Sequence, residues 1–358
     1  MKPFFYQSLP MRVRFGEGAM AHVADEVEQL GARAALVLCT PQQRDSAEAV
    51  MKALGDRAAG IFDGAVMHVP IETAEAARQV ATELGADCCV AIGGGSTIGL
   101  GKAIAMTSPL PIIAIPTTFA GSEMTPIYGI TEGGLKRTGR DPQVLPRSVI
   151  YDPTLTATLP PRIAATSGIN AIAHSVEALY AQDANPIISL MAEESIRALS
   201  GSLPRLVDSQ GADAEANAEA LYGAWLAGAC LGAVGMSIHH KLCHTLGGTF
   251  NLPHAEMHTI VLPHAVAYNR DAAPEAMARI SKALGGGDPA TGLYELARRL
   301  NVPLALKEIG MPEDGLERAA TLATENPYYN PRPIERDAIL ALLRHAWEGV
   351  PPAAGQGA

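Results

Sequence analysis

The two halves of the chain differ in the spacing of their apolar residues, and this difference constrains the fold most strongly. Up to about residue 150, short apolar runs such as ARAALVLC, ADCCVAIG and PLPIIAIP alternate with amphipathic segments such as SAEAVMKALG and IETAEAARQVATELG. Buried strands that alternate with helices are typical of a parallel sheet with helices on both faces. We therefore predict an α/β, Rossmann-like domain over residues 1–153.

After Asp152-Pro153, long segments rich in alanine and leucine dominate, and glycine and proline stand only at their joints. Examples are PIISLMAEESIRALSGSLPRLV and NAEALYGAWLAGACLGAVGM. With 358 residues in total, each half is long enough to bury a core of its own. We predict an all-α domain over residues 154–358, and we expect the tail from about 351 to 358 to be disordered.

Two smaller features belong to the first half. The segment ITEGGLKRTGRDPQVLPRSVIYDP is expected to form a hairpin-like excursion before a final strand, Ser148 to Tyr151. Residues 11–15, MRVRF, alternate between apolar and basic side chains and favour a strand. Such a strand can pair within the chain or with the sheet edge of a neighbouring copy.

A glycine-rich turn follows one predicted strand and opens the next helix. The run is IGGGST at residues 92–97. Glycines there let the backbone approach a pyrophosphate, and the amino terminus of the helix supplies free N–H groups and partial positive charge. Three glycines in a row can also form an ordinary turn. Because ligands of parallel sheets bind at the carboxyl ends of the strands, we predict a nucleotide site that contains Gly94, Gly95, Ser96, Thr117 and Thr118.

A third contact is expected at the strand end LCTP, which places Thr40 beside the nucleotide. An acidic residue at such a strand end binds the ribose 2′-hydroxyl and repels a 2′-phosphate. Threonine does neither strongly, so we expect NADH or NADPH as cofactor with weak discrimination between them. The alternative is that Thr40 is an ordinary turn residue.

Histidines recur in the second half at helical spacing. In TSGINAIAHSVEALYA, Asn170 and His174 are four residues apart and share one face of a helix. In SIHHKLCHTLGG, His240 and His244 repeat that spacing, and His254 follows in NLPHAEMH. A lone histidine is more often a core or surface residue than a ligand. Two such pairs in apolar helices indicate a functional site.

The first helix is predicted to begin at Thr166 or Ser167, whose hydroxyl would cap it. His239 and His258 fit no pair and are interpreted as bystanders. Asn170 is the informative residue, because a carboxylate there would complete a site for a divalent metal. A neutral amide is a poor ligand for iron or zinc, so no metal is expected.

Several classes of function are disfavoured. A net charge of -10 without a cluster of Lys and Arg argues against nucleic acid as a partner. It also requires that an anionic substrate find local positive charge. We find no apolar stretch that approaches the ~20 residues of a membrane span, and no signal peptide. The five cysteines form no disulfide framework, so a cytoplasmic protein is expected.

Over nearly its full length the chain resembles the iron-containing alcohol dehydrogenase family. The motifs that carry the resemblance are VAIGGGSTIGLGKAIA, IPTTFAGSEMT, GINAIAHSVEALYA and HHKLCHTLGGTFNLPHAEMH. It implies a nucleotide-binding domain followed by a helical domain, and a homodimer. It also implies that the family's metal ligands fall at Asn170, His174, His240 and His254, the first of which is aspartate in the family.

Within that family the chain is similar to the maleylacetate reductases, through GINAIAH, HHKLCHTLGG and ENPYYNPRP. This implies reduction of the carbon–carbon double bond of maleylacetate, a dicarboxylate, to 3-oxoadipate. The cofactor would be NADH or NADPH, and the setting would be bacterial breakdown of resorcinol, hydroxyquinol and chlorinated aromatics.

For such a reaction His244 is the expected donor to the enolate oxygen, and Tyr328 or Tyr329 would supply the second proton or hold a carboxylate. The four side chains at the family's metal positions would then bind substrate. Other candidate ligands for the carboxylates are Arg332, Lys241 and Arg137.

Two further functions stay open. One is a metal-dependent alcohol dehydrogenase in which Asn170 ligates through its carbonyl oxygen or is replaced by water. Bound iron or zinc and turnover of simple alcohols would favour it. The other is a nucleotide-sensing or metal-binding protein without catalysis. Cofactor binding without turnover of any enone or carbonyl would favour that one.

Overall fold

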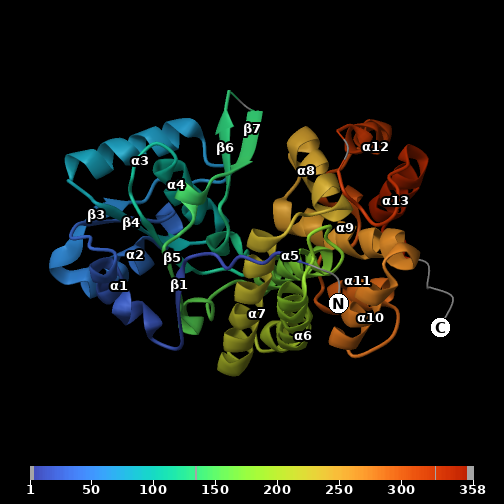
Figure 1. Cartoon of the computed structure of the whole chain (residues 1–358), viewed down its shortest axis with the longest axis horizontal. Coiled ribbons are helices and arrows are strands. Elements are labelled where there is room, and N and C mark those ends of the chain that lie inside the picture. Colours follow the sequence, from blue (N-terminus) through green and yellow to red (C-terminus); the bar gives the residue numbers. More distant parts are fainter. Residues whose placement is uncertain (1–3, 134, 327, 353–358) are drawn as a thin grey trace. The chain divides into compact units, whose positions relative to one another are not determined.

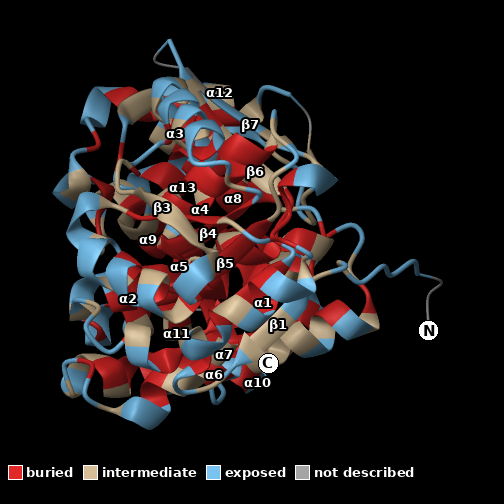
Figure 2. Cartoon of the chain, turned by 90° about the vertical axis from the view of Figure 1, so that its left-hand side faces the viewer, coloured by how far each residue is buried: buried red, intermediate tan, exposed pale blue. Residues whose placement is uncertain are grey.

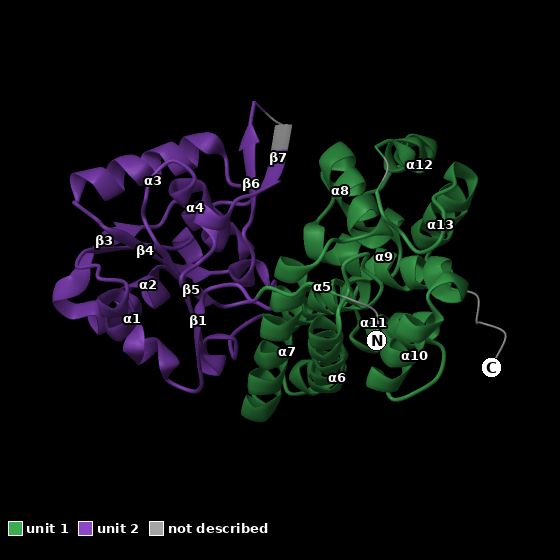
Figure 3. Ribbon diagram, viewed as in Figure 1, with its two compact units in different colours: residues 1–7, 160–358 green, residues 8–159 purple. Residues whose placement is uncertain are grey.

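The computed structural model describes residues 4–133, 135–326 and 328–352 (Figure 1). The chain forms two compact units (Figure 3). Unit 2 covers residues 8–159, and unit 1 covers the chain from residue 160 together with the segment before residue 8. The expected disorder of the tail concerns residues 353–358, which lie outside the described part of the chain.

Unit 2 is built on a parallel sheet of six strands in the order β1-β8-β5-β4-β2-β3. The strands are β1 (Arg12–Phe15), β2 (Ala35–Leu38), β3 (Ala58–Phe62), β4 (Cys88–Gly93), β5 (Ile112–Pro116) and β8 (Ser148–Tyr151). Strands β2, β4, β5 and β8 are buried at every position, which explains their continuous apolar runs (Figure 2). The predicted α/β fold class is confirmed.

Helices cover both faces of this sheet. The helices α1 (Val23–Gln29) and α2 (Arg44–Leu54) contribute to one buried cluster with Val37 and Val90. The helix α4 (Gly95–Ala105) packs against the opposite face, where a Cβ on Gly101 would lie 3.6 Å from Cβ of Ala91 and 3.7 Å from Cδ1 of Leu38. The helix α3 (Ile71–Glu83) packs beside α4. The alternation of side chains along β2 and β4 therefore divides the core of unit 2 between the two helix layers.

The edge strand β1 pairs within the chain, in parallel with β8, so that Arg12 lies opposite Ser148. One buried carboxylate holds this edge. Glu26 of α1 accepts hydrogen bonds of 3.0 Å from Arg12 Nε and from Arg14 Nη2, and one of 2.8 Å from Ser148 Oγ. Helix α1 is thereby tied to two strands through a single side chain.

The expected hairpin is present as β6 (Ile127–Glu132) and β7 (Leu135–Arg140), which pair antiparallel. Lys102 of α4 anchors the segment before it. Its buried Nζ donates to Ser122 O at 2.6 Å, Thr125 Oγ1 at 3.0 Å and Ile127 O at 2.8 Å. The helix behind the glycine-rich turn therefore also fixes the chain that follows Thr117 and Thr118.

The described residues of unit 1 form helices and connecting loops, without a strand. Its longer helices are α5 (Pro161–Leu179), α6 (Pro186–Asp208), α7 (Ala214–Ala233), α8 (Ile238–Phe250), α9 (His254–Asn269), α10 (Pro274–Ala283), α11 (Pro289–Arg299), α12 (Leu316–Thr324) and α13 (Arg336–Glu348). Within the described chain no single helix is long and apolar enough to cross a membrane, and α7 with α8 would pass that test only as a pair bent by 92°.

The predicted start of α5 is wrong. The helix begins at Pro161, because proline suits the first helical turn, where its missing N–H would have no helical acceptor. The hydroxyls of Thr166 and Ser167 instead lie inside the helix. They donate to the carbonyl oxygens of Arg162 at 2.9 Å and Ile163 at 2.7 Å.

Candidate active site

Helices α5, α8 and α9 bring the predicted histidines of unit 1 into one cluster. The Nδ1 atom of His174 lies 2.8 Å from Nε2 of His240, and both side chains are buried. The ring of His244 has its centroid 6.3 Å from that of His240. His254 is the first residue of α9, and its ring centroid lies 4.3 Å from that of His258. The histidines that the sequence pattern singled out therefore come together where these three helices pack.

A buried carboxylate, Glu177, contacts this cluster, and the sequence pattern did not single it out. It lies on α5 one turn beyond His174 and accepts a hydrogen bond of 2.8 Å from Nδ1 of His240. It also accepts the backbone N–H groups of Ser237 at 2.9 Å and His239 at 2.8 Å. Glu177 therefore caps the amino terminus of α8, where unsatisfied N–H groups favour a negative charge. Its spacing of seven residues from Asn170 was the available signal.

These contacts assign the protons of the imidazole pair. Because a carboxylate only accepts, His240 carries a proton on Nδ1. When the ring of His240 is neutral, its Nε2 accepts a hydrogen bond from Nδ1 of His174. The carboxylate of Glu177 thereby orients the ring of His240 directly and the ring of His174 through His240. Catalytic and metal-ligating histidines are commonly oriented by such a hydrogen bond to one ring nitrogen.

His239 and His258, which were interpreted as bystanders, lie inside the histidine cluster. Nε2 of His239 lies 3.0 Å from Nδ1 of His258, and Sγ of Cys243 lies 3.8 Å from the same His239 atom. Burial, followed by the neighbouring imidazoles, lowers the pKa values of both histidines well below 6.5. The two rings are therefore neutral. Together with Cys243 they provide three ligand atoms that lie within 4.8 Å of one another, a set that suits a soft metal cation.

Several buried polar atoms in or beside the cluster have no hydrogen-bond partner among the described residues. Those at the predicted site residues are Oδ1 of Asn170 and the hydroxyl of Tyr328. Burial, followed by the negative charge of Glu177, raises the pKa of Tyr328 above its ordinary value, so this side chain stays a phenol that can donate. Tyr329, the alternative, is 42% exposed. An acceptor and a donor are thus available to a ligand in unit 1.

The nucleotide features gather at the carboxyl edge of the sheet in unit 2. The chain leaves β2 toward β3 but leaves β4 toward β5, so the strand order reverses between β2 and β4, where open sheets bind ligands. Gly93 has a φ of +153°, and a Cβ there would lie 2.4 Å from Oγ1 of Thr97. A Cβ on Gly95, by contrast, would meet nothing within 4 Å. The first turn of α4 therefore has room for a phosphate.

Thr40 and Thr117 are joined through Gln43, a residue that no pattern in the sequence indicated. Oγ1 of Thr40 donates to Oε1 of Gln43 at 3.3 Å, and Nε2 of Gln43 donates to Oγ1 of Thr117 at 2.8 Å. A Cβ on Gly94 would lie 3.0 Å from Cγ2 of Thr118. Thr40 and Thr117 are thus connected at the ends of β2 and β5, and Gly94 lies beside Thr118 between the ends of β4 and β5.

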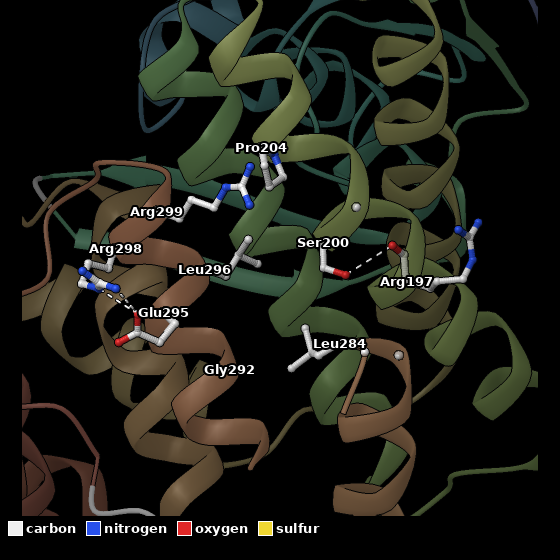
Figure 4. A pocket seen from close by; sticks show the side chains of 12 residues that line it. Arg197, Ser200, Pro204, Leu284, Gly292, Glu295, Leu296, Arg298 and Arg299 are labelled. Atoms are coloured by element: carbon white, nitrogen blue, oxygen red, sulfur yellow. Dashed lines mark hydrogen bonds and ion pairs between the residues drawn. The ribbon is translucent and has the colours of Figure 1, made fainter. Parts of the chain in front are cut away.

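A hollow of about 700 Å³ lies elsewhere in unit 1, among α6, α10 and α11 (Figure 4). Its arginines are already paired. Arg298 lies 2.5 Å from Glu295, and Arg197 lies 2.8 Å from Glu194. Its lining includes none of the predicted site residues, so we assign it no role in the reaction.

Comparison with known proteins identifies the family. The family model "Iron-containing alcohol dehydrogenase" matches residues 10–153, and "Fe-containing alcohol dehydrogenase family, C-terminal" matches residues 164–347. The chain belongs to the iron-containing alcohol dehydrogenase family. The resemblance drawn from the sequence is therefore confirmed.

Similar members of this family carry a more specific name. Maleylacetate reductase of Sphingobium indicum is 59% identical over 98% of this chain and 99% of its own. That of Burkholderia cepacia is 59% identical over 98% of this chain and 100% of its own. The crystal structure of maleylacetate reductase from Agrobacterium tumefaciens is 52% identical and covers 98% of this chain and 100% of its own, with a TM-score of 0.95.

The residues at the family's metal positions fit a divalent cation poorly. Asn170 supplies a neutral amide, so the four side chains include no anionic ligand. Nδ1 of His174 and Nε2 of His240 are already engaged with each other at 2.8 Å. We therefore derive no step of the reaction through a metal.

Proposed function

We propose that the chain is a maleylacetate reductase, which reduces the carbon–carbon double bond of maleylacetate to give 3-oxoadipate with NADH or NADPH. The observation that carries the proposal is the set of Asn170 and its histidines, which contains no anionic ligand and is held in place by the buried carboxylate of Glu177. The relatives named maleylacetate reductase support the same activity.

The substrate determines what the chain must provide. Maleylacetate is an enone that carries a carboxylate at each end. Bound NADH or NADPH supplies a hydride to the alkene carbon β to the ketone, and the electron pair of the double bond then forms an enolate. Donors must stabilise the enolate oxygen, and a proton must reach the carbon between the ketone and the reduced position.

We assign these tasks to His244 and Tyr328. His244 lies one helical turn beyond His240 and is exposed on α8, where it can donate to the enolate oxygen. The hydroxyl of Tyr328 is the second donor, since it is a phenol without a partner among the described residues. Asn170, His174, His240 and His254 bind and orient the substrate.

The absence of an anionic ligand is consistent with this chemistry. Reduction of a simple carbonyl develops a concentrated alkoxide, which a divalent cation stabilises strongly. The negative charge of an enolate is spread over oxygen and carbon. Hydrogen bonds from imidazole and phenol groups are sufficient for such a charge.

Thr40, Gly94, Gly95, Ser96, Thr117 and Thr118 hold the cofactor in this proposal. Residues 1–153 form the nucleotide-binding domain, and residues 154–358 form the helical catalytic domain. The enzyme works in the cytoplasm as a homodimer in bacterial degradation of aromatic compounds. Its partner is a small dicarboxylate and not a nucleic acid or a membrane.

A metal-dependent alcohol dehydrogenase is the second candidate, favoured by two observations. Oδ1 of Asn170 is a buried oxygen without a partner in the described chain. In addition, His239, Cys243 and His258 form a group that can hold a metal ion.

The decisive experiment measures NADH oxidation with maleylacetate after exhaustive treatment with chelator, with metal content determined on the same sample. Full activity in metal-free protein is expected. Activity that vanishes and returns with iron or zinc would overturn the metal-free mechanism. If neither the metal-free nor the metal-loaded protein reduces maleylacetate, and the protein turns over simple alcohols, the second candidate is established.

A further inference from the structure

A dicarboxylate must find positive charge in a protein whose net charge is -10. Three cationic residues were candidates for this role. Arg332 is engaged, because its guanidinium lies 4.2 Å from the ring centroid of Tyr268 and donates from Nη1 to the carbonyl oxygen of Tyr268 at 3.3 Å. Arg137 is paired with Glu132 at 3.3 Å on the hairpin β6–β7.

The segment around Arg332 has a structural role instead. The side-chain amides of Asn330 and Asn269 exchange hydrogen bonds of 2.9 and 2.7 Å. The hydroxyl of Tyr268 donates to the carbonyl oxygen of Pro333 at 2.6 Å. With these contacts Arg332 fixes the chain after Tyr328 onto α9, and this fixes the position of the Tyr328 ring.

Lys241 differs from both arginines. It follows His240 on α8 and lies three residues before His244, so the two side chains project from neighbouring positions of the helix. Its Nζ is 5.6 Å from the centroid of the Tyr328 ring. It forms no ion pair with any carboxylate of the described residues. An aromatic ring steadies the ammonium group without neutralising it.

We propose that Lys241, held over the ring of Tyr328, pairs with one carboxylate of the substrate and thereby sets a preference for dicarboxylates. This inference rests on the proposed function, since it names the group that binds one end of maleylacetate. The pair places a substrate carboxylate beside His244 on the same helix. Lys241 contributes to substrate binding and takes no part in the proton transfers.

The chain offers a matched control. Lys307 has its Nζ 5.4 Å from the centroid of the Trp347 ring, also in unit 1, and the proposal gives it no part in the site. Both Lys241→Met and Lys307→Met remove an ammonium from an aromatic face while keeping a long apolar side chain. A general effect of losing such a contact would appear in both variants.

The test uses three substrates with wild type and both variants. One is maleylacetate, and the other two are analogues that each replace one of its carboxylates by a methyl group. For maleylacetate, Lys241→Met is expected to raise KM roughly 10- to 100-fold while kcat changes little, because a charged hydrogen bond is lost from substrate and transition state alike. The penalty should disappear for one analogue and persist for the other. Lys241→Arg should restore part of the loss.

Equal penalties for all three substrates, or none, would overturn the pairing. So would a fall in kcat at unchanged KM, or a similar loss in Lys307→Met. Calorimetric binding of 3-oxoadipate to the same proteins separates this result from the proposed function. If the wild type fails to turn over maleylacetate, the reductase assignment is wrong. A loss of 3-oxoadipate binding confined to Lys241→Met would still support the carboxylate site, and unchanged binding would reject it.

Discussion

The carboxylate of Glu177 accepts a hydrogen bond of 2.8 Å from Nδ1 of His240 and, at the same time, the first backbone N–H groups of the helix that carries His240. One buried side chain therefore fixes both the position of α8 and the tautomer of an imidazole in the site. A histidine that must present a defined nitrogen needs such a partner.

Replacement of Glu177 by glutamine is expected to lower kcat about 10- to 100-fold, the usual effect of removing a group that orients a functional histidine. The new amide group donates where the carboxylate accepted, so Nδ1 of His240 and the N–H groups of α8 can no longer all be satisfied. Steady-state kinetics and a thermal melt measure the two effects. Glu193→Gln is the control and should keep wild-type kcat. It removes the carboxylate of α6 that pairs with Arg279 and Lys282 of α10.

His244 is expected to be needed for catalysis and not for cofactor binding. His244→Asn should reduce kcat about 100- to 10,000-fold, the range over which a positioned acid–base group contributes. NADH affinity, measured by fluorescence titration, should stay within twofold of wild type. A variant that loses NADH affinity in parallel with kcat would show that His244 supports the structure and does not donate to the enolate.

The sequence pattern predicted the elements whose determinants are local. The strand and glycine turn before α4 follow from a continuous apolar run and three adjacent glycines, and the pair Asn170–His174 follows from helical spacing. Glu177 was missed because its role depends on α8, whose contacting residues lie at least 60 positions away. The contact between His239 and His258 could not be predicted for the same reason, since the two residues meet across two helices.

Asn170→Asp is expected to create a metal site. The substitution supplies the anionic oxygen that the donor set lacks, beside imidazoles that are already buried. After incubation with iron or zinc and removal of excess metal, the variant should retain about one ion per chain more than wild type does. Metal content by mass spectrometry is the readout. The same comparison in a Cys243→Ala background separates this site from the His239–Cys243–His258 group.

Asn170→Ala serves as the matched control for the aspartate variant. It removes the amide without adding a charge and should retain no additional metal. Equal metal contents in the alanine and aspartate variants would contradict the argument from the donor set.

Substitutions of Gly93 and Gly95, which lie in the same turn, are expected to have different effects. Gly95→Val is expected to fold normally, since a Cβ there meets nothing within 4 Å, but its side chain would occupy the space proposed for the pyrophosphate. NADH affinity should fall at least about tenfold with an unchanged melting temperature. Gly93→Ala should instead destabilise the protein, because its Cβ would lie 2.4 Å from Oγ1 of Thr97. Native NADH affinity in Gly95→Val would exclude this turn as the phosphate site.

Low pH is expected to destabilise the sheet edge at β1, because protonation of Glu26 weakens its hydrogen bonds to Arg12, Arg14 and Ser148. Burial acts to raise the pKa of this carboxyl, but hydrogen bonds from Arg12, Ser148 and Arg14 outweigh it and hold the pKa below 4.5. The folded state therefore binds this proton less readily than the unfolded state. The stabilisation is present in full above pH 4.5 and is lost as the pH falls through the lower, folded value.

Glu26→Gln should consequently cost about 2 kcal/mol at pH 7, the scale of hydrogen bonds to a charged group. The difference from wild type should shrink steadily as the pH is lowered from 5 toward 3, because the wild-type carboxyl becomes protonated there and loses the same interactions. Urea unfolding followed by circular dichroism at several pH values measures this difference. Glu17→Gln removes an exposed carboxylate next to β1 and should show neither the cost nor its dependence on pH. A cost for Glu26→Gln that stays constant down to pH 3 would mean that packing, and not the charge of Glu26, holds β1 to α1.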